Sequence, residues 1–600
     1  MARVVRAPQD SIVDGRNGGT CPRIETTPGV PHLGSAQRFA CRGRATKAPC
    51  CGRNLRLRKP GTVIATPARK RGTQPPRLSF ARLERASLYN LDVRVRLFLT
   101  AWIVFSLHYA TDFVREHFLV VSMVEDRTFD LEPYLGMHPD IFSSPPNAAV
   151  KGVHHGANPG ISMLAAIPYV FARPFVDRIV ARQLAVRRAR NDTSAVYNDP
   201  RAARVQFYRA AVERGLDVRF GLVGVITMVL CMAPLSAFGV VVMFTLLRGA
   251  GLQEKTSAWL SMLYAFGTPV LFRTAYLNQN LAIGVVALTA LLLLWNPSNV
   301  VRIRPQRRLV LAGLAGGFAF LCDYSGALAT GLLGLYAMAR GRDADSSFGG
   351  PWRAALGYGL GAAVPLVVLW YYQWAAFGNF ILPPQHWMPA AQALSEHGYQ
   401  GITGPSWELF QMLLLHPQFG LFVFAPLLIL ALGAPFVAAR RQSFVPNREL
   451  LLCGLIGFAF ILFFSTVQYT RLQWSTGIRY LMPIVPFLFV AAAVTLVRLP
   501  KWVAWPVVVV ALTVSWSIAM VRNQYGVSTN VIRVFVEGLQ LPWLSTLGRM
   551  AKQYAPWLDG RPSALPAMLL TAVLVAGIWL IKRPRQALVA APLATAERDS

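Results

Sequence analysis

The stretch that decides the fold is "LFLTAWIVFSLHYATDFVREHF", residues 97 to 118. Its first part, Leu97 to Thr111, carries no Asp, Glu, Lys or Arg, and such an apolar run is typical of a helix that crosses a membrane. Asp112, Arg115 and Glu116 follow at helical spacing. The sequence therefore predicts an acid, a base and a second acid at the boundary between lipid and water.

The composition of the whole chain agrees with a membrane protein. Of its 600 residues 54% are hydrophobic and only 15% are charged, and the mean hydropathy is +0.40. Apolar runs of roughly 17 to 25 residues recur between residues 97 and 581, and each could cross the hydrocarbon core as a helix. We therefore predict an all-α polytopic membrane protein.

We predict about twelve transmembrane helices with both chain ends in the cytosol. They lie at residues 97–111, 220–247, 256–274, 278–297, 309–322, 324–340, 354–377, 419–438, 449–467, 480–498, 502–520 and 565–582. The connections expected in the cytosol are basic, as the positive-inside rule requires. These basic residues are Arg302, Arg304, Arg307, Arg308, Arg340, Arg342, Arg440, Arg441, Arg498, Lys501, Lys582, Arg583 and Arg585.

The first outer loop holds a segment that does not fit this scheme. "ISMLAAIPYVFA", Ile161 to Ala172, is apolar but too short to cross, so we expect a docked or re-entrant helix. Residues 173–219 would then lie outside although they are rich in Arg. Residues 112–160 hold seven acids against three bases and are expected outside, with an amphipathic interfacial helix over residues 113–124.

The chain divides into four predicted parts. Residues 1–85 form a basic disordered cytosolic tail with no apolar core of a signal peptide, and nucleic-acid binding by this tail is the weaker alternative. Residues 86–525 form the transmembrane module, 526–585 a C-terminal outer loop with the last span, and 586–600 a second cytosolic tail.

Asp112 has two interpretations at this stage. As a structural residue it would cap the next helix, with Arg115 and Glu116 as ordinary helical neighbours. As a chemical group at head-group depth, its carboxylate could accept a proton from an acceptor hydroxyl or amine. A guanidinium nearby could then hold a departing phosphate.

A resemblance favours the chemical interpretation. "DFVREHFLVVSMVEDRTFDLEPY", residues 112–134, resembles the start of the first outer loop of type-C glycosyltransferases, the GT-C superfamily. That superfamily includes aminoarabinose transferases and protein O-mannosyltransferases. Matched without gaps, the catalytic Asp of the family falls on Asp112, and an Arg that often follows it falls on Arg115.

Further segments resemble the family in the same order, over roughly residues 95 to 500. They are "HHGANPGISMLAAIPYVFA", "LAGLAGGFAFLCDYSGALATGLLGLYAM", "WYYQWAAFGNF", "HPQFGLFVFAPLLILAL" and "WSTGIRYLMPIVPFL". Two departures bear on the substrate. Ala157 and Asn158 stand where relatives often have a Lys, and residues 276–280 ("YLNQN") stand where relatives often have a His.

The resemblance implies Asp112 as the catalytic residue and a set of substrate-binding candidates. These candidates are Arg115, Glu116, His154, His155, Asp323, Arg479 and Tyr480. Each has a structural alternative: Arg479 could be an interfacial Arg that reaches for water, with Arg471 a weaker phosphate ligand. The two His residues could be loop structure, and Asp323 could cap the helix that follows. Asp140 is a weaker candidate for a second carboxylate.

The implied activity is that of a membrane glycosyltransferase, which moves a sugar with inversion from a polyprenyl-phosphate-linked donor to an extracytoplasmic acceptor. Asp112 would act as base, and Arg115 and Arg479 would hold the leaving phosphate. The partners would be the lipid donor, the bilayer of the bacterial inner membrane and an acceptor glycan, lipid or protein, with no nucleic acid. No metal-ligand cluster is evident, although some relatives use a divalent cation, so such an ion stays possible.

Two other functions compete with this one. A transporter or flippase of lipid-linked sugars also needs a polar cavity, but two related halves are not evident. Charged residues also gather at the ends of spans rather than inside them, which argues against an ion-coupled path. The third alternative is a non-catalytic descendant that only binds a lipid or a partner.

Overall fold

The computed structural model describes residues 91–191, 197, 199, 202–344, 346–389, 398–471, 477–522, 526–554 and 562–581. The predicted tails at 1–85 and 586–600 lie outside these residues, as do four of the seven cysteines. The other three, Cys231, Cys322 and Cys453, are buried free thiols.

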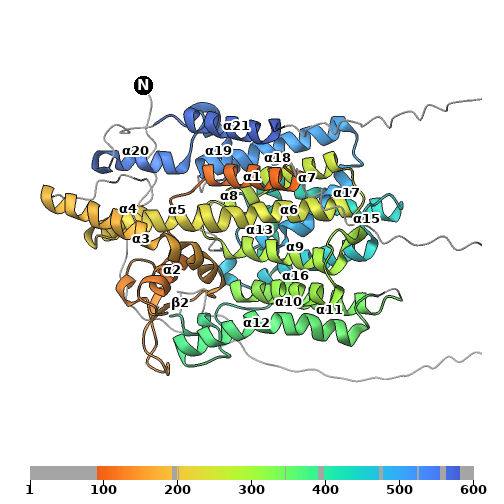
Figure 1. Ribbon diagram of the computed structural model, residues 1–600, viewed down its shortest axis with the longest axis horizontal. Helices are drawn as coiled ribbons and strands as arrows, with labels where there is room; N and C mark the ends of the chain where they lie inside the picture. The colour runs from red at the N-terminus through yellow and green to blue at the C-terminus, as the bar shows by residue number, and fades with distance from the viewer. Residues whose placement is uncertain are drawn as a thin grey trace, which may run out of the picture. The chain divides into compact units, whose positions relative to one another are not determined.

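The described part of the chain is almost entirely helical (Figure 1). Its α-helices are α1 Val93–Leu107, α2 Arg115–Glu125, α3 Gly160–Arg190, α4 Ala202–Glu213, α5 Asp217–Thr227, α6 Ala233–Gly249, α7 Glu254–Phe266, α8 Val270–Arg273, α9 Gln279–Trp295, α10 Pro305–Cys322, α11 Gly326–Gly341, α12 Pro351–Phe377, α13 Trp407–Leu415, α14 Leu421–Phe424, α15 Ala434–Ala439, α16 Asn447–Phe464, α17 Val485–Leu496, α18 Lys501–Val521, α19 Val527–Glu537, α20 Pro542–Tyr554 and α21 Leu565–Leu580. Short 3-10 or π segments are η2 Glu132–Tyr134, η3 Met228–Met232, η4 Pro297–Asn299, η5 Pro384–Trp387, η7 Pro426–Gly433, η8 Gln468–Arg471 and η9 Met482–Ile484. The strands β1 Ile141–Ser143 and β2 Val153–His155 pair antiparallel.

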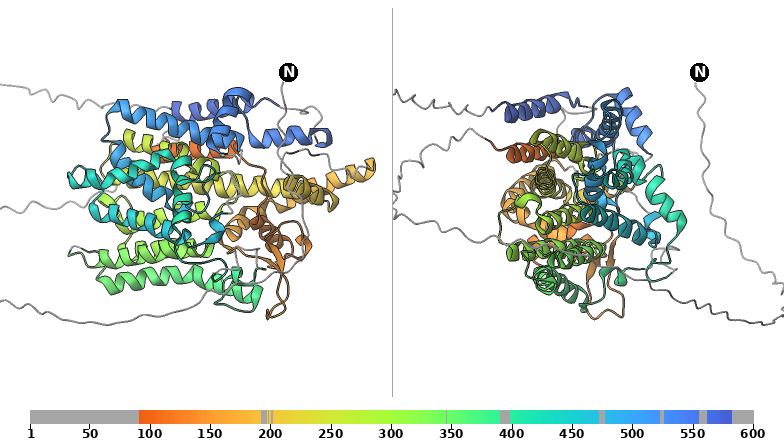
Figure 2. Two further views of the ribbon diagram at one scale, coloured as in Figure 1. Left: turned by 180° about the vertical axis from the view of Figure 1, so that it is seen from behind. Right: turned by 90° about the vertical axis from the view of Figure 1, so that its right-hand side faces the viewer.

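The long helices lie side by side with their axes roughly aligned (Figures 1 and 2). α1 packs on α6, α6 on α9, α9 on α10, and α10 on α12. The last contact is close because it is lined by glycine. A Cβ on Gly313 of α10 would lie 1.9 Å from the carbonyl oxygen of Tyr358 on α12. The "GLAGG" stretch therefore serves helix packing, as small residues do in membrane bundles.

The surface of the long helices is that of an integral membrane protein. Within the described residues, four helical segments are long and apolar enough to cross a membrane: Asp217–Gly249, Pro351–Phe377, Asn447–Phe464 and Lys501–Val521. Four shorter apolar helices accompany them: Gln279–Trp295, Pro426–Ala439, Met482–Leu496 and Leu565–Leu580. α21 has no buried residue: it packs on α1 along one side, and the apolar side chains on its other sides are open, which is stable against lipid. The prediction of twelve spans stays a prediction.

The helix before Asp112 ends earlier than predicted. α1 stops at Leu107, and α2 starts only at Arg115, with Val114 in the N-cap position. Asp112 therefore lies in a non-helical segment and does not cap α2. The expected placement of Asp112, Arg115 and Glu116 on one helical face is wrong, because the helix is interrupted between them.

The short docked helix predicted from the sequence is part of a much longer one. α3 runs over 31 residues, Gly160–Arg190. Its Arg-rich half stays helical because charges in it are paired. Arg187 contacts Asp217 of α5 at 2.9 Å, and Arg173 contacts Asp177 one turn later at 3.5 Å. The apolar pattern alone does not show where this helix ends.

Candidate functional site

The segment that carries Asp112 is fixed by elements from distant parts of the sequence. The backbone N–H of Ala110 donates to the carbonyl oxygen of Ala275, which follows α8, at 2.9 Å. The guanidinium of Arg204 on α4 donates to the carbonyl and hydroxyl oxygens of Thr111 at 2.9 and 3.0 Å. The hydroxyl of Thr111 also bonds that of Thr546 on α20 at 2.7 Å. An irregular segment tied down at both backbone and side chain holds its carboxylate in a fixed place.

The Asp112 carboxylate lies between two guanidinium groups. Arg204 Nη2 is 2.9 Å from Asp112 Oδ1, and Arg522 Nη2 is 3.7 Å from Asp112 Oδ2. The Asp112 side chain is 32% exposed, so solvent or a ligand can reach it. A second carboxylate, the fully buried Asp199, lies 3.7 Å from Arg204 and also contacts Arg549 of α20.

Arg522 connects this group to a further arginine through Tyr276. The Arg522 guanidinium lies 5.2 Å from the centroid of the Tyr276 ring. Arg273, which is fully buried at the end of α8, donates to the hydroxyl of Tyr276 and to the carbonyl oxygens of Gly477 and Ile478. Arg204 and Arg522 thus flank one partly open carboxylate, and Arg273 is linked to Arg522 through Tyr276. We call Asp112, Arg204, Arg273 and Arg522 the Asp112 cluster.

The other predicted charges form a second group, which we call the Glu116 cluster: Arg115, Glu116, Asp140 and Arg479. Arg115 Nε is 3.2 Å from Glu116 Oε1, and Arg115 Nη1 is 2.9 Å from Asp140 Oδ2. Glu116 is buried, with 4% of its surface exposed. The ion pairs of Arg115 in the described structure are made with these two acids and not with Asp112.

Arg479 lies close enough for its charge to act on Glu116 and Asp140, and also on Arg273 of the Asp112 cluster. The Arg479 guanidinium lies 5.4 Å from the Tyr480 ring. Burial by itself would raise the pKa of Glu116, but the charges of Arg115 and then Arg479 outweigh burial and lower that pKa. At Asp140 burial is likewise outweighed, and the charges of Arg115, then His138 and Arg479, lower the pKa. Both acids are therefore held as carboxylates by the two arginines.

His154 and His155 lie on β2 and serve the loop structure through one nitrogen each. Nδ1 of His155 accepts the backbone N–H of Ala157 at 3.0 Å, and Nδ1 of His154 lies 3.2 Å from the carbonyl oxygen of Phe129. Burial and then the charge of Arg115 lower the pKa of His155 to about 3. The Nε2 atoms of both rings have no partner within the described residues. The structure thus brings His155, but not Asp112, next to Arg115.

Asp323 lies at the turn between α10 and α11, with both oxygens engaged. Oδ1 accepts the backbone N–H of Ser325 and Oδ2 accepts the side-chain amide of Gln279 from the start of α9, both at 2.9 Å. The nearby amide of Asn158 donates to the carbonyl oxygen of Phe320 at 3.0 Å. Asp323 is not the N-cap of the following helix, which is Ser325, and its contacts instead join the ends of α9, α10 and α11.

The main cations beside Asp112 escaped the sequence analysis. Arg204 lies in the Arg-rich stretch 173–219, which stood out only as a conflict with the positive-inside rule. Arg273 and Arg522 each end an apolar run, where a cation is ordinary. In the sequence these arginines share only a place near helix ends on the same side of the membrane. The fold is needed to show that those helix ends meet.

A metal site has no support in the described residues, where no group of three or more His, Cys, Asp or Glu side chains is placed to hold an ion. In Figure 1, α2, which carries Arg115 and Glu116, and α4, which carries Arg204, lie at the left-hand end of the long helices.

Comparisons with known proteins add one resemblance of shape. The structure is similar to that of ArnT. The match is to the crystal structure of ArnT from Cupriavidus metallidurans in the apo state, with 17% sequence identity, 82% of this chain and 74% of that chain covered, and a TM-score of 0.40. At these values the likeness assigns no residue and no activity. No protein-family model and no curated protein matches the sequence.

Proposed function

We propose that the chain is an integral membrane glycosyltransferase that uses a polyprenyl-phosphate-linked sugar, with its site on the extracytoplasmic side of the bacterial inner membrane. The observation that carries the proposal is the Asp112 cluster. A carboxylate that caps no helix, stays 32% exposed and is flanked by guanidinium groups at 2.9 and 3.7 Å can serve both proton transfer and phosphate binding.

In the proposed reaction the acceptor hydroxyl or amine attacks the anomeric carbon of the lipid-linked sugar. Asp112 takes the proton from the acceptor as the new bond to the sugar forms. The bond between that carbon and the phosphate oxygen breaks, and the polyprenyl phosphate leaves with the electron pair. Arg204 and Arg522 stabilise the charge that develops on the leaving phosphate, an effect that is large in a poorly hydrated site.

This assignment shifts the phosphate role within the predicted set. Arg115 is engaged by Glu116 and Asp140, so a phosphate would have to displace two carboxylates to reach it. Arg204 also contacts two carboxylates, Asp112 and the buried Asp199, but Arg204 and Arg522 both border Asp112, whose side chain is 32% exposed and within reach of a ligand. We therefore propose Arg204 and Arg522 as the phosphate ligands. We propose that the pair of Arg115 and Glu116 holds their helix, α2, in position.

The test is the substitution Asp112→Asn in the full-length protein, reconstituted with a radiolabelled polyprenyl-phosphate sugar and membrane extract as acceptor. Loss of a general base lowers the rate by roughly 10²- to 10⁴-fold, while binding of the lipid donor stays. Asp126→Asn is the matched control, because Asp126 is an exposed residue at the end of α2, and it should keep the wild-type rate.

The same variant separates the enzyme from the flippase. A flippase needs no base at Asp112, so translocation of a fluorescent lipid-linked sugar by Asp112→Asn vesicles at the wild-type rate, with no transfer by either protein, would contradict the enzyme. Transfer by Asp112→Asn within tenfold of the wild-type rate would also end the proposal.

A further inference from the structure

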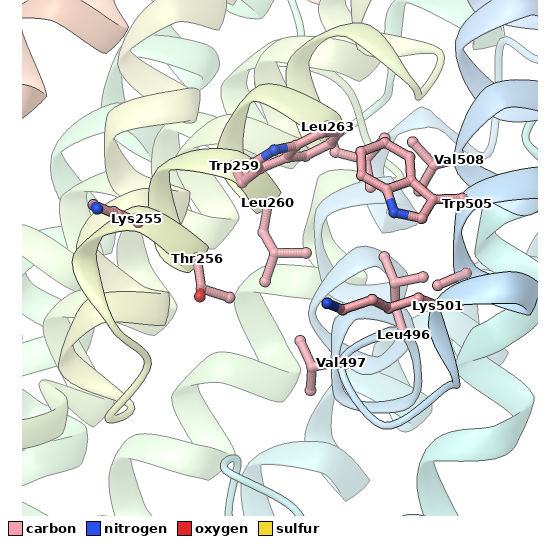
Figure 3. A pocket seen from close by; sticks show the side chains of 11 residues that line it. Lys255, Thr256, Trp259, Leu260, Leu263, Leu496, Val497, Lys501, Trp505 and Val508 are labelled. Carbon is pink, nitrogen blue, oxygen red and sulfur yellow. The ribbon is translucent and has the colours of Figure 1, made fainter.

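A pocket lies between α7 and α18, away from both clusters. It has a volume of about 310 Å³ and is shown in Figure 3. Its lining residues are Lys255, Thr256, Trp259, Leu260, Leu263, Leu496, Val497, Lys501, Ala504, Trp505 and Val508. Two lysines and two tryptophans thus surround a floor of Leu, Val and Ala side chains.

The pocket lies at the other membrane face from Asp112. Lys501 is the first residue of α18, and Arg522, which contacts Asp112, directly follows the last. The 21 residues of this helix span about 30 Å at ~1.5 Å per residue, which is the thickness of the hydrocarbon core. The pocket therefore sits where the head groups of the opposite leaflet lie.

The polar end of the pocket favours an anion. In Figure 3 the Lys501 side chain reaches from α18 into the gap toward Thr256 and Val497, whereas the nitrogen of Lys255 points away from the centre. The structure shows no ion pair or hydrogen bond of the Lys501 ammonium to any residue that it describes. The ammonium of Lys501, in a pocket that Thr256 also lines, suits a phosphate oxygen.

The apolar end favours a hydrocarbon chain. The rings of Trp259 and Trp505 pack edge to face, with their centroids 5.5 Å apart. They are 47% and 53% exposed, so they form a wall of the pocket that faces the lipid. Leu260 and Val508 are buried beneath them. Lys and Trp side chains commonly anchor a membrane protein at the lipid–water interface, where no pocket is needed. Here they border a cavity within the size range of small-molecule sites, roughly 300 to 1,000 Å³.

We propose that this pocket binds one anionic phospholipid from the leaflet opposite the Asp112 cluster. The lipid phosphate lies against the Lys501 ammonium and the Thr256 hydroxyl, and the upper part of an acyl chain runs over Leu260 and Val508 to the tryptophan wall. Basic pockets between membrane helices bind anionic head groups by this combination of charge and chain burial. The site is independent of the glycosyltransferase proposal.

The experiment is native mass spectrometry of the purified full chain, titrated with phosphatidylglycerol or phosphatidylcholine. We expect the first phosphatidylglycerol to bind more tightly than phosphatidylcholine, and Lys501→Gln to weaken phosphatidylglycerol alone by about fivefold. Ala504→Trp places a ring in the pocket and should weaken both lipids. Arg440→Gln is the control, since Arg440 is a cation outside the pocket, and it should change neither affinity.

Equal affinity of the wild-type protein for the two lipids would overturn the proposal, as would unchanged phosphatidylglycerol binding in both Lys501→Gln and Ala504→Trp. Displacement of phosphatidylglycerol by an equal concentration of inorganic phosphate would show a plain anion site and would also overturn it. Thermal unfolding verifies that each variant is folded. If Lys501→Gln fails to fold, Ala504→Trp and the comparison of the two lipids still decide.

Discussion

The Asp112 cluster and the Glu116 cluster contain the same kinds of side chain but differ in balance and exposure. In the Glu116 cluster two arginines face two carboxylates, and Glu116 is buried. In the Asp112 cluster two arginines flank a carboxylate that is 32% exposed, a third arginine is linked to them through Tyr276, and the buried Asp199 pairs with Arg204. A balanced buried group has its charges satisfied by the protein. A cationic group with an open carboxylate is suited to receive an anion and a proton.

Glu116→Gln should give the largest loss of stability. It removes the buried carboxylate that Arg115 contacts at 3.2 Å, and removal of one partner of a buried ion pair costs roughly 3–5 kcal/mol. Thermal unfolding of the purified protein should show a clear drop in the midpoint. Glu408→Gln is the matched control, because Glu408 pairs with Arg471 at the surface, and its midpoint should not move. If the Glu116→Gln protein is as stable as the wild type but fails in sugar transfer, Glu116 is a catalytic residue. The structural role given to the Glu116 cluster would then be wrong.

Arg522→Gln tests the other cluster. A hydrogen bond to a charged group contributes about 1.5–3 kcal/mol, so loss of a phosphate ligand should raise the KM for the lipid donor roughly 10- to 100-fold. The KM for the acceptor should stay the same. Arg219→Gln removes an arginine that pairs with Glu125 and Asp177, and it should leave the donor KM unchanged. A donor KM that rises equally in both variants would mean that Arg522 acts only through stability.

Acid should destabilise the Glu116 cluster, with His155 as a main cause. Its pKa is lowered to about 3 by burial, so the folded protein keeps the ring neutral while the unfolded chain binds a proton below pH 6.5. Stability is then present above pH 6.5 and falls as the pH drops from 6.5 toward 3, by about 1.4 kcal/mol per pH unit for this group. The lowered pKa values of Glu116 and Asp140 act in the same direction at lower pH, as their carboxylates become protonated.

His155→Asn isolates this contribution, because the Asn amide oxygen can accept the backbone N–H that His155 accepts from Ala157. Unfolding measured at pH 7 and pH 5.5 should show a smaller loss of stability in the variant than in the wild-type protein. The same loss in both proteins would show that His155 does not titrate in this range.

The sequence predicted a mostly helical membrane protein, but not the neighbours of Asp112. Apolar runs locate helices, and a break in such a run locates Asp112, because both are local properties. The ion pairs of Asp112 come from α4 and from the end of α18, far along the chain. A predicted helical face linked Asp112 to Arg115, and the irregular segment between α1 and α2 separates them.

Asp140 is a second residue whose contacts could not be predicted from the sequence. The sequence made it a weak candidate, because a lone acid in an outer loop has no local pattern. The pairing of β1 with β2 orders the loop that brings it to Arg115, at 2.9 Å, and such pairing depends on two segments at once. Local pattern thus gives the elements, while the fold decides which charges meet.

Of the substitutions in the two clusters, Asp140→Asn should have the smallest effect on stability and on the transfer rate. Its side chain is 36% exposed, so water screens its pairing with Arg115, and exposed pairs contribute about 0–1 kcal/mol. Unfolding should shift little, and transfer should stay within a few-fold of the wild-type rate, because Glu116 still balances Arg115. If transfer instead falls as far as in Asp112→Asn, the two clusters act as one site, and the division between a structural and a chemical group has to be given up.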